Sequence, residues 1–275
     1  MKKVALVTSC GFGVRAKEVC MQLFEQGYEV VAVNEKPYTP ELQGAKISFE
    51  QVDYSSKESI EQLLAKLKEI QFNVVVNCHD ALAFVKDNLR HDFYDFDYAD
   101  FAKVLNVNIV SIAAICIGMK DNIVKGGCIV NITSSAAKEG GFVTIAYNAS
   151  KAAVENLSKS LANNFGQYNG VRVNCVAPGW IPKSAGVATV GTRALADAMT
   201  PIPPSGQNKD LAKAVIDVIN NSSINGATIV VDGGIASSYL PYMLESLLER
   251  NDTTVESVMN KLTELIKQEK EKARK

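Results

Sequence analysis

Histidine is scarce in this chain of 275 residues, which contains only His79 and His91. Zinc sites built from several histidines are therefore excluded, and we expect no metal site. A catalytic serine triad would have to use one of these two histidines. The Gly-x-Ser-x-Gly turn that exposes the nucleophile in many hydrolases is also missing from the sequence.

Signals for export, membrane insertion and nucleic-acid binding are missing as well. None of the six cysteines forms a Cys-x-x-Cys pair, and Met1 leads directly into a strand-like stretch instead of a secretory signal. We therefore expect a cytoplasmic protein with reduced thiols, most of them small core residues. No apolar run approaches the roughly 20 residues of a membrane span. The formal net charge of -1 gives no electrostatic reason for a nucleic-acid partner.

Strand-like and helical patterns alternate along most of the chain. Short apolar runs predict strands at residues 3–8, 29–33, 47–52, 73–76, 128–132, 171–176 and 227–231. Helical spacing predicts a helix that ends at Gly27 and further helices at residues 56–70, 98–123, 146–165 and 210–219. Runs that are apolar on both faces are typical of a parallel sheet covered by helices on both sides. The sequence thus predicts an α/β fold, a doubly wound, Rossmann-like parallel sheet of about seven strands, which binds ligands beyond the carboxyl ends of its strands.

Two segments depart from this alternation. The Gly/Ser/Pro-rich stretch at residues 183–206 predicts a lid over a site. Residues 239–275 predict a C-terminal helical extension, in which Thr253 and Glu256 form a capping-box pair ahead of an apolar stripe. We expect this stripe to dock on its own domain or on a partner subunit, because acidic residues dilute its basic face too far for a membrane surface. Residues 1–238 are expected to form one domain.

A tyrosine and a lysine carry the first chemical signal. Tyr147 and Lys151 are spaced i, i+4 on a predicted helix, so their side chains share one face. The lysine charge would lower the tyrosine pKa, and a tyrosine so tuned can exchange a proton with an alcohol oxygen. Chance alone supplies roughly 0.75 such pairs in a chain of this composition, so the pair could equally be a surface contact.

Polar residues and glycines follow several of the predicted strands. Ser134 follows the strand at 128–132 and lies shortly before Tyr147. It can hydrogen-bond a substrate oxygen in the crevice, or it can be an ordinary turn residue. Pro178-Gly179 and Val231-Asp-Gly-Gly end two further strands.

Together these pieces resemble the short-chain dehydrogenase/reductase family, in its single-domain branch, over residues 3–238. The matching pieces, in chain order, are the first strand with its glycine turn, Asp53, Asn77, Asn108, Ser134, Tyr147-x-x-x-Lys151, Pro178-Gly179 and Val231-Asp-Gly-Gly. The resemblance implies that the first domain binds a dinucleotide and is catalytic, as an NAD(P)-dependent oxidoreductase that interconverts a ketone and a secondary alcohol. It also implies a small-molecule or carrier-bound carbonyl substrate and a homodimer or homotetramer.

The resemblance also implies residue roles. Tyr147 would be the general acid in reduction and the base in oxidation. Lys151 would lower the pKa of Tyr147 and hold the nicotinamide ribose, and Ser134 would polarise the substrate carbonyl. Asn108 would anchor a proton-relay water behind Lys151, although an ordinary helix amide is the alternative. The family pattern places the cofactor against Gly11, Phe12, Gly13, Asn34, Lys36, Asp53, Asn77, Tyr147, Lys151, Pro178, Gly179 and Ile181, with Asp53 at the adenine.

The cofactor loop departs from the family pattern. Family members usually read Thr-Gly-x-x-x-Gly-x-Gly after the first strand, whereas this chain reads Thr8-Ser9-Cys10-Gly11-Phe12-Gly13. Gly11 and Gly13 still allow a pyrophosphate to approach a helix N-terminus closely. The shorter loop offers fewer backbone N–H groups to phosphate, so we expect cofactor binding that is weakened or re-routed.

Two further segments depart from the family. Asn77-Cys78-His79-Asp80 stands where Asn-Asn-Ala-Gly is usual. His79 and Asp80 add bulk and charge where small residues pack near adenosine, and we expect a structural or substrate-neutral role in preference to a catalytic His-Asp pair. After Pro178-Gly179-Trp180-Ile181 the usual threonine is replaced around Lys183, which could contact a cofactor phosphate, an acidic substrate or only solvent.

Cofactor choice rests on the end of the second strand. An acidic residue there would bind the ribose 2′-hydroxyl and favour NAD(H). Asn34 is neutral, and Lys36 or Arg15 could pair with a 2′-phosphate, whereas Glu35 argues for NAD(H). The balance favours NADP(H). Two other functions stay open: a binding or regulatory protein on a scaffold with a weakened cofactor site, and a dehydratase or isomerase that uses Tyr147 without net redox chemistry.

Overall fold

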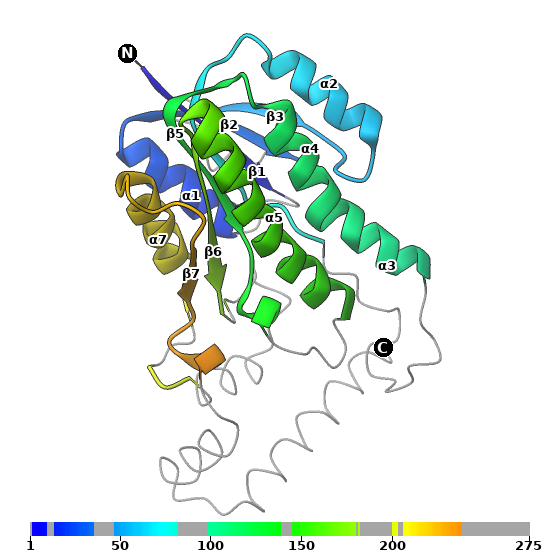
Figure 1. Ribbon diagram of the computed structural model, residues 1–275, viewed down its shortest axis with the longest axis vertical. Helices are drawn as coiled ribbons and strands as arrows, with labels where there is room; N and C mark the ends of the chain where they lie inside the picture. Colours follow the sequence, from blue (N-terminus) through cyan, green and yellow to red (C-terminus); the bar gives the residue numbers. More distant parts are fainter. Residues whose placement is uncertain are drawn as a thin grey trace, which may run out of the picture.

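A single sheet of seven parallel strands organises the described part of the chain, in the order β3-β2-β1-β4-β5-β6-β7 (Figure 1). The computed structural model describes residues 2–9, 14–35, 47–81, 98–138, 145–179, 181, 200–202 and 206–237. The strands are β1 (Lys3–Ser9), β2 (Tyr28–Asn34), β3 (Ile47–Gln51), β4 (Phe72–Asn77), β5 (Ile123–Ile132), β6 (Arg172–Pro178) and β7 (Thr228–Val231). The helices are α1 (Val14–Glu25), α2 (Lys57–Leu67), α3 (Tyr98–Leu105), the π-helical turn η3 (Asn106–Val110), α4 (Ser111–Gly118), the 3-10 turn η4 (Ser135–Lys138), α5 (Ile145–Asn169), α7 (Asn208–Asn220) and the 3-10 turn η5 (Ile235–Ser237).

The central strands are buried on both faces, as their apolar runs predict. Residues 5–9 of β1 and 74–77 of β4 are all buried, and the two strands pair in parallel. The chain winds outward from β1 to β3 and then returns to β4 on the other side of β1. This reversal lies between β1 and β4, and open α/β sheets bind ligands at such a point, beyond the carboxyl ends of the strands. The doubly wound α/β fold is thus confirmed.

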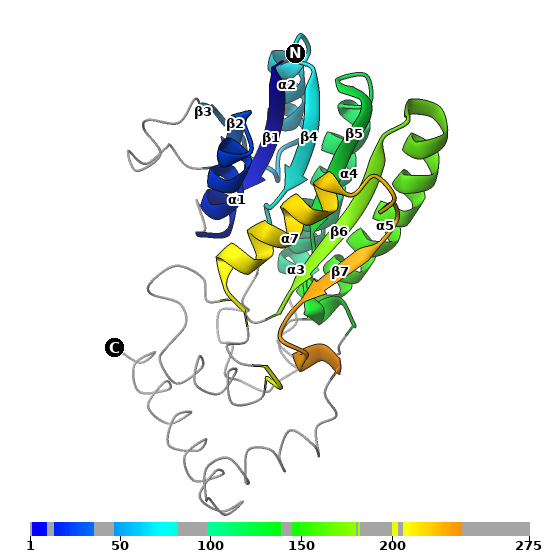
Figure 2. The same ribbon diagram turned by 90° about the vertical axis from the view of Figure 1, so that its left-hand side faces the viewer.

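Helices cover both faces of this sheet. Helices α1 and α7 lie together on one face, and α2, α3, α4 and α5 lie on the other (Figures 1 and 2). Each face has its own apolar core: Val19 and Leu23 of α1 belong to one, and Leu63 of α2 and Ile115 of α4 belong to the other. Burying such a side chain contributes about 1.5–3 kcal/mol, so the two cores hold the helices firmly against the sheet.

Local signals set the helix ends. The Ser56 side chain accepts a hydrogen bond from the Ser59 backbone N–H and caps α2, whose buried residues include Ile60 and Leu67. Gly27 has a φ of 82°, which only glycine adopts easily, and it ends α1 as predicted. Where α4 meets α2, a Cβ on Gly118 would lie 2.5 Å from Leu64 Cδ1, so glycine permits the close approach of the two helices.

The expectation that no apolar stretch approaches membrane-spanning length needs correction. Residues Tyr98–Gly118 form one helical run of 21 residues with a hydropathy of 1.8, which is long and apolar enough to cross a membrane by length and composition. One face of the run instead lines the core of the domain, where Ile112, Ile115 and Cys116 are fully buried. The run is a core helix of the α/β fold. It ends at Gly118, before the predicted boundary at residue 123, and contains the π-helical turn η3.

Strand β5 also starts earlier than predicted, at Ile123 instead of Cys128. The Gly126-Gly127 pair favours a loop in the sequence, but here it fits a register irregularity against β4. Gly126 has a φ of 85°, and a Cβ on Gly127 would lie 2.6 Å from Ile123 Cγ2. The predicted helical extension at residues 239–275 and most of the predicted lid lie outside the described residues.

Candidate active site

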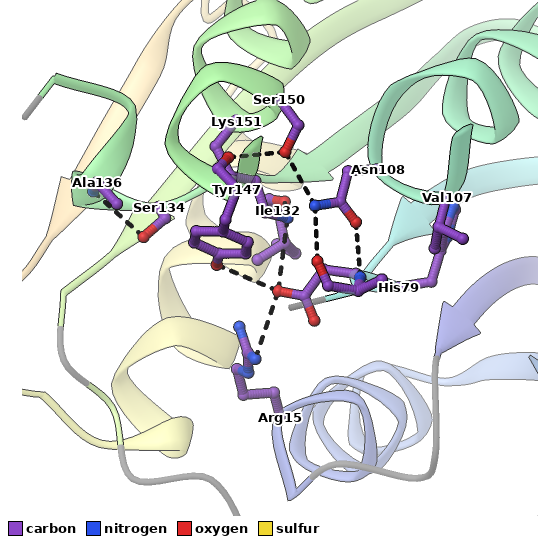
Figure 3. Close-up of polar contacts among 12 residues, drawn as sticks. Arg15, His79, Val107, Asn108, Ile132, Ser134, Ala136, Tyr147, Ser150 and Lys151 are labelled. Carbon is purple, nitrogen blue, oxygen red and sulfur yellow. Dashed lines mark hydrogen bonds and ion pairs between the residues drawn. The ribbon is translucent and has the colours of Figure 1, made fainter. Parts of the chain in front are cut away.

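The predicted catalytic residues meet at the carboxyl edge of the sheet. Ser134 follows the end of β5, and Tyr147 and Lys151 lie on the first turns of α5. In Figure 3, Tyr147 lies between Ser134, Lys151 and Arg15, the last of which comes from the first turn of α1. Segments that are distant in sequence thus bring a hydroxyl, a phenol and two cations into one site.

Lys151 is held in place beside the Tyr147 ring. Its side chain is 1% exposed, and Nζ donates a hydrogen bond of 3.0 Å to the backbone oxygen of Ile132, the last residue of β5. The ammonium lies 5.5 Å from the centroid of the Tyr147 ring. The i, i+4 spacing on α5 therefore puts both side chains on one side of the helix, as predicted, where both approach Asp80.

Asp80 is the site residue that the sequence interpretation missed. The Tyr147 hydroxyl donates a hydrogen bond of 3.2 Å to Asp80 Oδ2. The same oxygen lies 3.6 Å from Arg15 Nη2 and 3.6 Å from Lys151 Nζ. The expectation of a structural or substrate-neutral role stays a prediction for Asp80, and these contacts place the carboxylate at the phenol. The one sequence signal was a carboxylate at a position where the family usually has glycine.

The expected lowering of the Tyr147 pKa is not found. Burial raises the pKa of Tyr147 above its ordinary value of 10.0, and the Asp80 carboxylate raises it further. The Arg15 charge and a hydrogen bond from Ser134 lower the pKa, but they do not compensate. The prediction that a lysine charge would make this phenol unusually acidic was therefore wrong for the protein in the state described. It neglected the neighbouring carboxylate and the desolvation of a phenolate.

Asn108 lies in the π-helical turn η3 and is fully buried. Its Oδ1 accepts a hydrogen bond of 2.6 Å from the Ala81 N–H, and its Nδ2 donates to the Ala81 carbonyl and to Ser150 Oγ, each at 2.9 Å. Ser150 in turn donates to the Tyr147 carbonyl at 2.7 Å. Asn108 therefore ties the segment after β4, which includes Asp80, to the start of α5. The role of Asn108 in a proton relay stays a prediction.

His79 points away from the phenol and is a structural residue, as expected. Its ring stacks on Tyr54 with centroids 3.9 Å apart and an interplanar angle of 2°. Nε2 lies 2.7 Å from Ser111 Oγ, whose own proton is donated to the Val107 carbonyl, so Nε2 carries the ring proton. Nδ1 then accepts from Thr8 Oγ1 at 2.6 Å. Burial lowers the pKa of His79 to about 3, so the ring is neutral.

The predicted cofactor residues fall into three groups. Asn34, Asn77, Pro178 and Gly179 lie at or directly after the carboxyl ends of β2, β4 and β6, and Ile181 follows two residues later. Asp53 lies after β3, where its carboxylate accepts hydrogen bonds from the backbone and side chain of Ser55, an arrangement typical of a turn. Gly11, Phe12, Gly13 and Lys36 lie outside the described residues.

Asn77 and Arg15 are engaged with protein groups. The Asn77 amide donates to Asn131 Oδ1 at 2.8 Å and to Cys116 Sγ at 3.4 Å, which links β4 to β5 and α4. Arg15 pairs with Asp80 beside Tyr147, so its side chain serves the reaction end of the site in this structure. The alternative in which Arg15 meets a 2′-phosphate stays a prediction.

The donor set fits a nicotinamide dinucleotide at this edge. A buried ammonium and a phenol lie together beyond β5, next to the reversal point between β1 and β4 where such ligands bind in open α/β sheets. Ammonium and hydroxyl groups are the donors that suit a ribose. The Asp80 carboxylate lies between these donors and contacts both the Tyr147 hydroxyl and the Lys151 ammonium.

Comparison with known proteins shows the family to which the chain belongs. The sequence profile of a family described as "Enoyl-(Acyl carrier protein) reductase" matches residues 15–236. An uncharacterized oxidoreductase of Schizosaccharomyces pombe is 30% identical over 269 residues, which cover 92% of this chain and 98% of the relative. The 2-dehydro-3-deoxy-D-gluconate 5-dehydrogenase of Dickeya dadantii is 28% identical, with 84% and 94% covered. A 3-oxoacyl-(acyl-carrier-protein) reductase of Haemophilus influenzae is 29% identical, with 85% and 98% covered.

Solved structures share the fold at lower identity. 4-Hydroxyisoleucine dehydrogenase in complex with NADH superposes with a TM-score of 0.74 at 21% identity, covering 86% of this chain and 100% of that one. BdcA in complex with NADPH gives a TM-score of 0.71 at 20% identity, covering 84% and 93%. The sheet order, the site at its carboxyl edge and the extent of the sequence match agree, and this chain belongs to the short-chain dehydrogenase/reductase family.

Proposed function

We propose that the protein is an NAD(P)-dependent oxidoreductase that interconverts a ketone and a secondary alcohol, with Tyr147 as general acid and base. The observation that carries the proposal is the meeting of the Tyr147 phenol, the buried Lys151 ammonium and the Ser134 hydroxyl at the carboxyl edge of the sheet. Relatives named as dehydrogenases and reductases over most of the chain support the same reaction class.

The residues divide the proton chemistry between them. The bound cofactor supplies or accepts the hydride. In the reductive direction the Tyr147 O–H bond breaks and the proton passes to the substrate oxygen, while the Ser134 hydroxyl donates a hydrogen bond to that oxygen. Lys151 holds the cofactor ribose and stabilises the resulting phenolate by its charge. In oxidation the same steps run in reverse.

NADP(H) is the cofactor that we favour over NAD(H). Asn34 ends β2, and its neutral amide does not repel a 2′-phosphate as a carboxylate would. Structures of the same fold in complex with NADH and with NADPH are consistent with either cofactor. The substrate is a small-molecule or carrier-bound carbonyl, in keeping with relatives named for a sugar acid and for an acyl carrier protein.

The variant Tyr147→Phe tests the role of the phenol. We expect turnover of NADPH with acetoacetyl-coenzyme A, or of NADP with 2-dehydro-3-deoxy-D-gluconate, to fall by at least about 100-fold, because general acid–base catalysis contributes that much. Dinucleotide binding should persist. Tyr168→Phe is the matched control, since Tyr168 lies on the same helix and is 72% exposed. Unchanged turnover in Tyr147→Phe would remove the phenol from the mechanism.

One observation favours a second candidate, a binding or regulatory protein. Asp80 contacts Tyr147, Lys151 and Arg15, so the groups that would meet a cofactor already have a protein partner. A calorimetric titration with NADPH and with NADH separates the candidates. Saturable binding supports the oxidoreductase, whereas no binding of either dinucleotide at about millimolar concentration supports the regulatory protein.

A further inference from the structure

We propose that Asp80 is a positioning residue that keeps the proton on Tyr147, so that the site accepts a proton only at alkaline pH. This inference rests on the proposed role of Tyr147. It starts from one hydrogen bond, in which the Tyr147 hydroxyl donates its single proton to Asp80 Oδ2 at 3.2 Å. A hydrogen bond to an anion is possible only from the protonated phenol, because a phenolate would face the carboxylate with like charge.

Burial strengthens this effect. The Asp80 side chain is only 8% exposed, and water screens its charge poorly at that depth. Tyr147 is partly buried, and the resulting desolvation disfavours the charged form of the phenol before any neighbour is considered. Burial and the carboxylate act in the same direction, and both raise the pKa of Tyr147.

Two cations oppose Asp80. Arg15 lies beside both the carboxylate, 3.6 Å from Oδ2, and the phenol, and its charge lowers the pKa of Tyr147. Lys151 lies at the same distance from Oδ2. Without Asp80 these two cations would face the phenol alone, and they would stabilise a phenolate. Asp80 therefore offsets part of the positive charge that these two cations place beside the phenol.

Two other titratable neighbours, Cys78 and His79, are neutral at physiological pH. Burial raises the pKa of the Cys78 thiol to about 12 and lowers that of the His79 ring to about 3. Glu155, one turn beyond Lys151 on α5, accepts a hydrogen bond from Thr133. Among the groups that contact the phenol in the described residues, Asp80, Arg15 and Lys151 thus carry the charges that matter.

The consequence concerns the direction of the reaction. Reduction needs a protonated phenol, which Tyr147 provides over the whole neutral range with or without Asp80, because the ordinary pKa of tyrosine is 10.0. Oxidation needs a phenolate, which Asp80 suppresses, so oxidation should become efficient only at alkaline pH. Asp80 cannot alter the overall equilibrium, but it sets the pH above which oxidation runs. The family usually has glycine at this position, and a glycine would leave the cations unopposed.

The experiment is an ultraviolet titration of tyrosinate absorbance in the full-length, ligand-free protein. The chain has nine tyrosines, so the signal of Tyr147 must be isolated. For each protein, the curve of the same protein with the added substitution Tyr147→Phe is subtracted. We expect Tyr147 to stay protonated well past 10.0 in the wild-type protein and to ionise below 10.0 in Asp80→Asn. Asp121→Asn, which removes the same charge from an exposed turn at the amino-terminal edge of the sheet, should leave the titration of Tyr147 unchanged.

A second substitution gives a change of opposite sign. In the Asp80→Asn background, Arg15→Gln should move the Tyr147 midpoint upward by roughly one pH unit, because it removes a stabilising cation. A role of Asp80 in folding alone predicts no such reversal. If Asp80→Asn does not fold, the wild-type titration still decides, since a midpoint at or below 10.0 overturns the proposal.

Equal midpoints in the wild-type protein and in Asp80→Asn would also overturn it. These titrations use neither cofactor nor substrate, so they can fail while dinucleotide binding and turnover succeed. Failure of the proposed function would appear separately, as retained turnover in Tyr147→Phe or as an absence of dinucleotide binding.

Discussion

His79 makes a specific prediction about stability and pH. Its ring is fully buried between Tyr54, Thr8 and Ser111, and burial lowers the pKa of His79 from 6.5 to about 3. In the unfolded chain the ring regains its ordinary pKa and binds a proton below about pH 6.5. Protonation therefore favours the unfolded chain as pH falls. The contribution of His79 to stability is complete above 6.5 and is lost progressively from 6.5 down to about 3.

The magnitude follows from the linkage between folding and proton binding. Between about pH 7.5 and about pH 5.5 the unfolded histidine becomes roughly nine-tenths protonated, while the folded ring stays neutral, so the free energy of unfolding falls by about 1.4 kcal/mol. His79→Phe removes this loss and keeps an aromatic ring against Tyr54. It also removes two hydrogen bonds, so it should be less stable than the wild-type protein by about 1–3 kcal/mol at neutral pH.

Urea unfolding at both pH values measures the effect. The wild-type protein should lose about 1.4 kcal/mol more than His79→Phe over this interval. His91→Asn removes the other histidine of the chain and should behave as the wild-type protein does. Equal pH dependence in the wild-type protein and in His79→Phe would show that the buried neutral ring contributes nothing, and loss of the dependence in His91→Asn would assign it to the other histidine.

Two further predictions concern Asn108 and Lys151. Asn108→Ala leaves the partners of a fully buried amide unpaired, so the free energy of unfolding measured in urea should fall by about 2–3 kcal/mol. The control Asn156→Ala, at an exposed position, should change it by less than about 0.5 kcal/mol. An unchanged free energy of unfolding in Asn108→Ala would contradict the bridging role of Asn108. Lys151→Met should weaken NADPH binding by about 10- to 100-fold in calorimetry, because a charged hydrogen-bond donor is lost. The control Lys159→Met, at an exposed position, should bind NADPH as the wild-type protein does. Equal NADPH affinities of Lys151→Met and the wild-type protein would exclude Lys151 from the cofactor site.

The sequence predicted the fold well because its signals are local. Strand runs that are apolar on both faces require two covering layers of helices, and the observed seven-stranded parallel sheet has them. The errors came where tertiary contacts decide. The strand predicted at residues 128–132 starts earlier, at Ile123, and includes an irregular pairing with β4. The helix at residues 98–118 contains a π-helical turn around Asn108 that no local pattern announces.

The site was predictable only in part for the same reason. The spacing of Tyr147 and Lys151 on one helix is a local property of the sequence. The position of Ser134 at the end of a strand also follows largely from the local sequence. The partnership of Asp80 with Arg15, Lys151 and Tyr147 joins segments after β4, on α1 and on α5, so it depends on the folded topology. Its consequence for the pKa of Tyr147 depends further on burial, which residue spacing does not give. The boundary at residue 238 and the oligomeric state stay predictions.

The most direct test of the central claim is a calorimetric titration of the wild-type protein with NADPH and NADH, repeated with Tyr147→Phe. The account predicts saturable binding of NADPH below about millimolar concentration, tighter than that of NADH, and retained binding in the variant, whose turnover is lost. Absence of binding of both dinucleotides to the wild-type protein would contradict the assignment of the Tyr147–Lys151 site to nicotinamide chemistry.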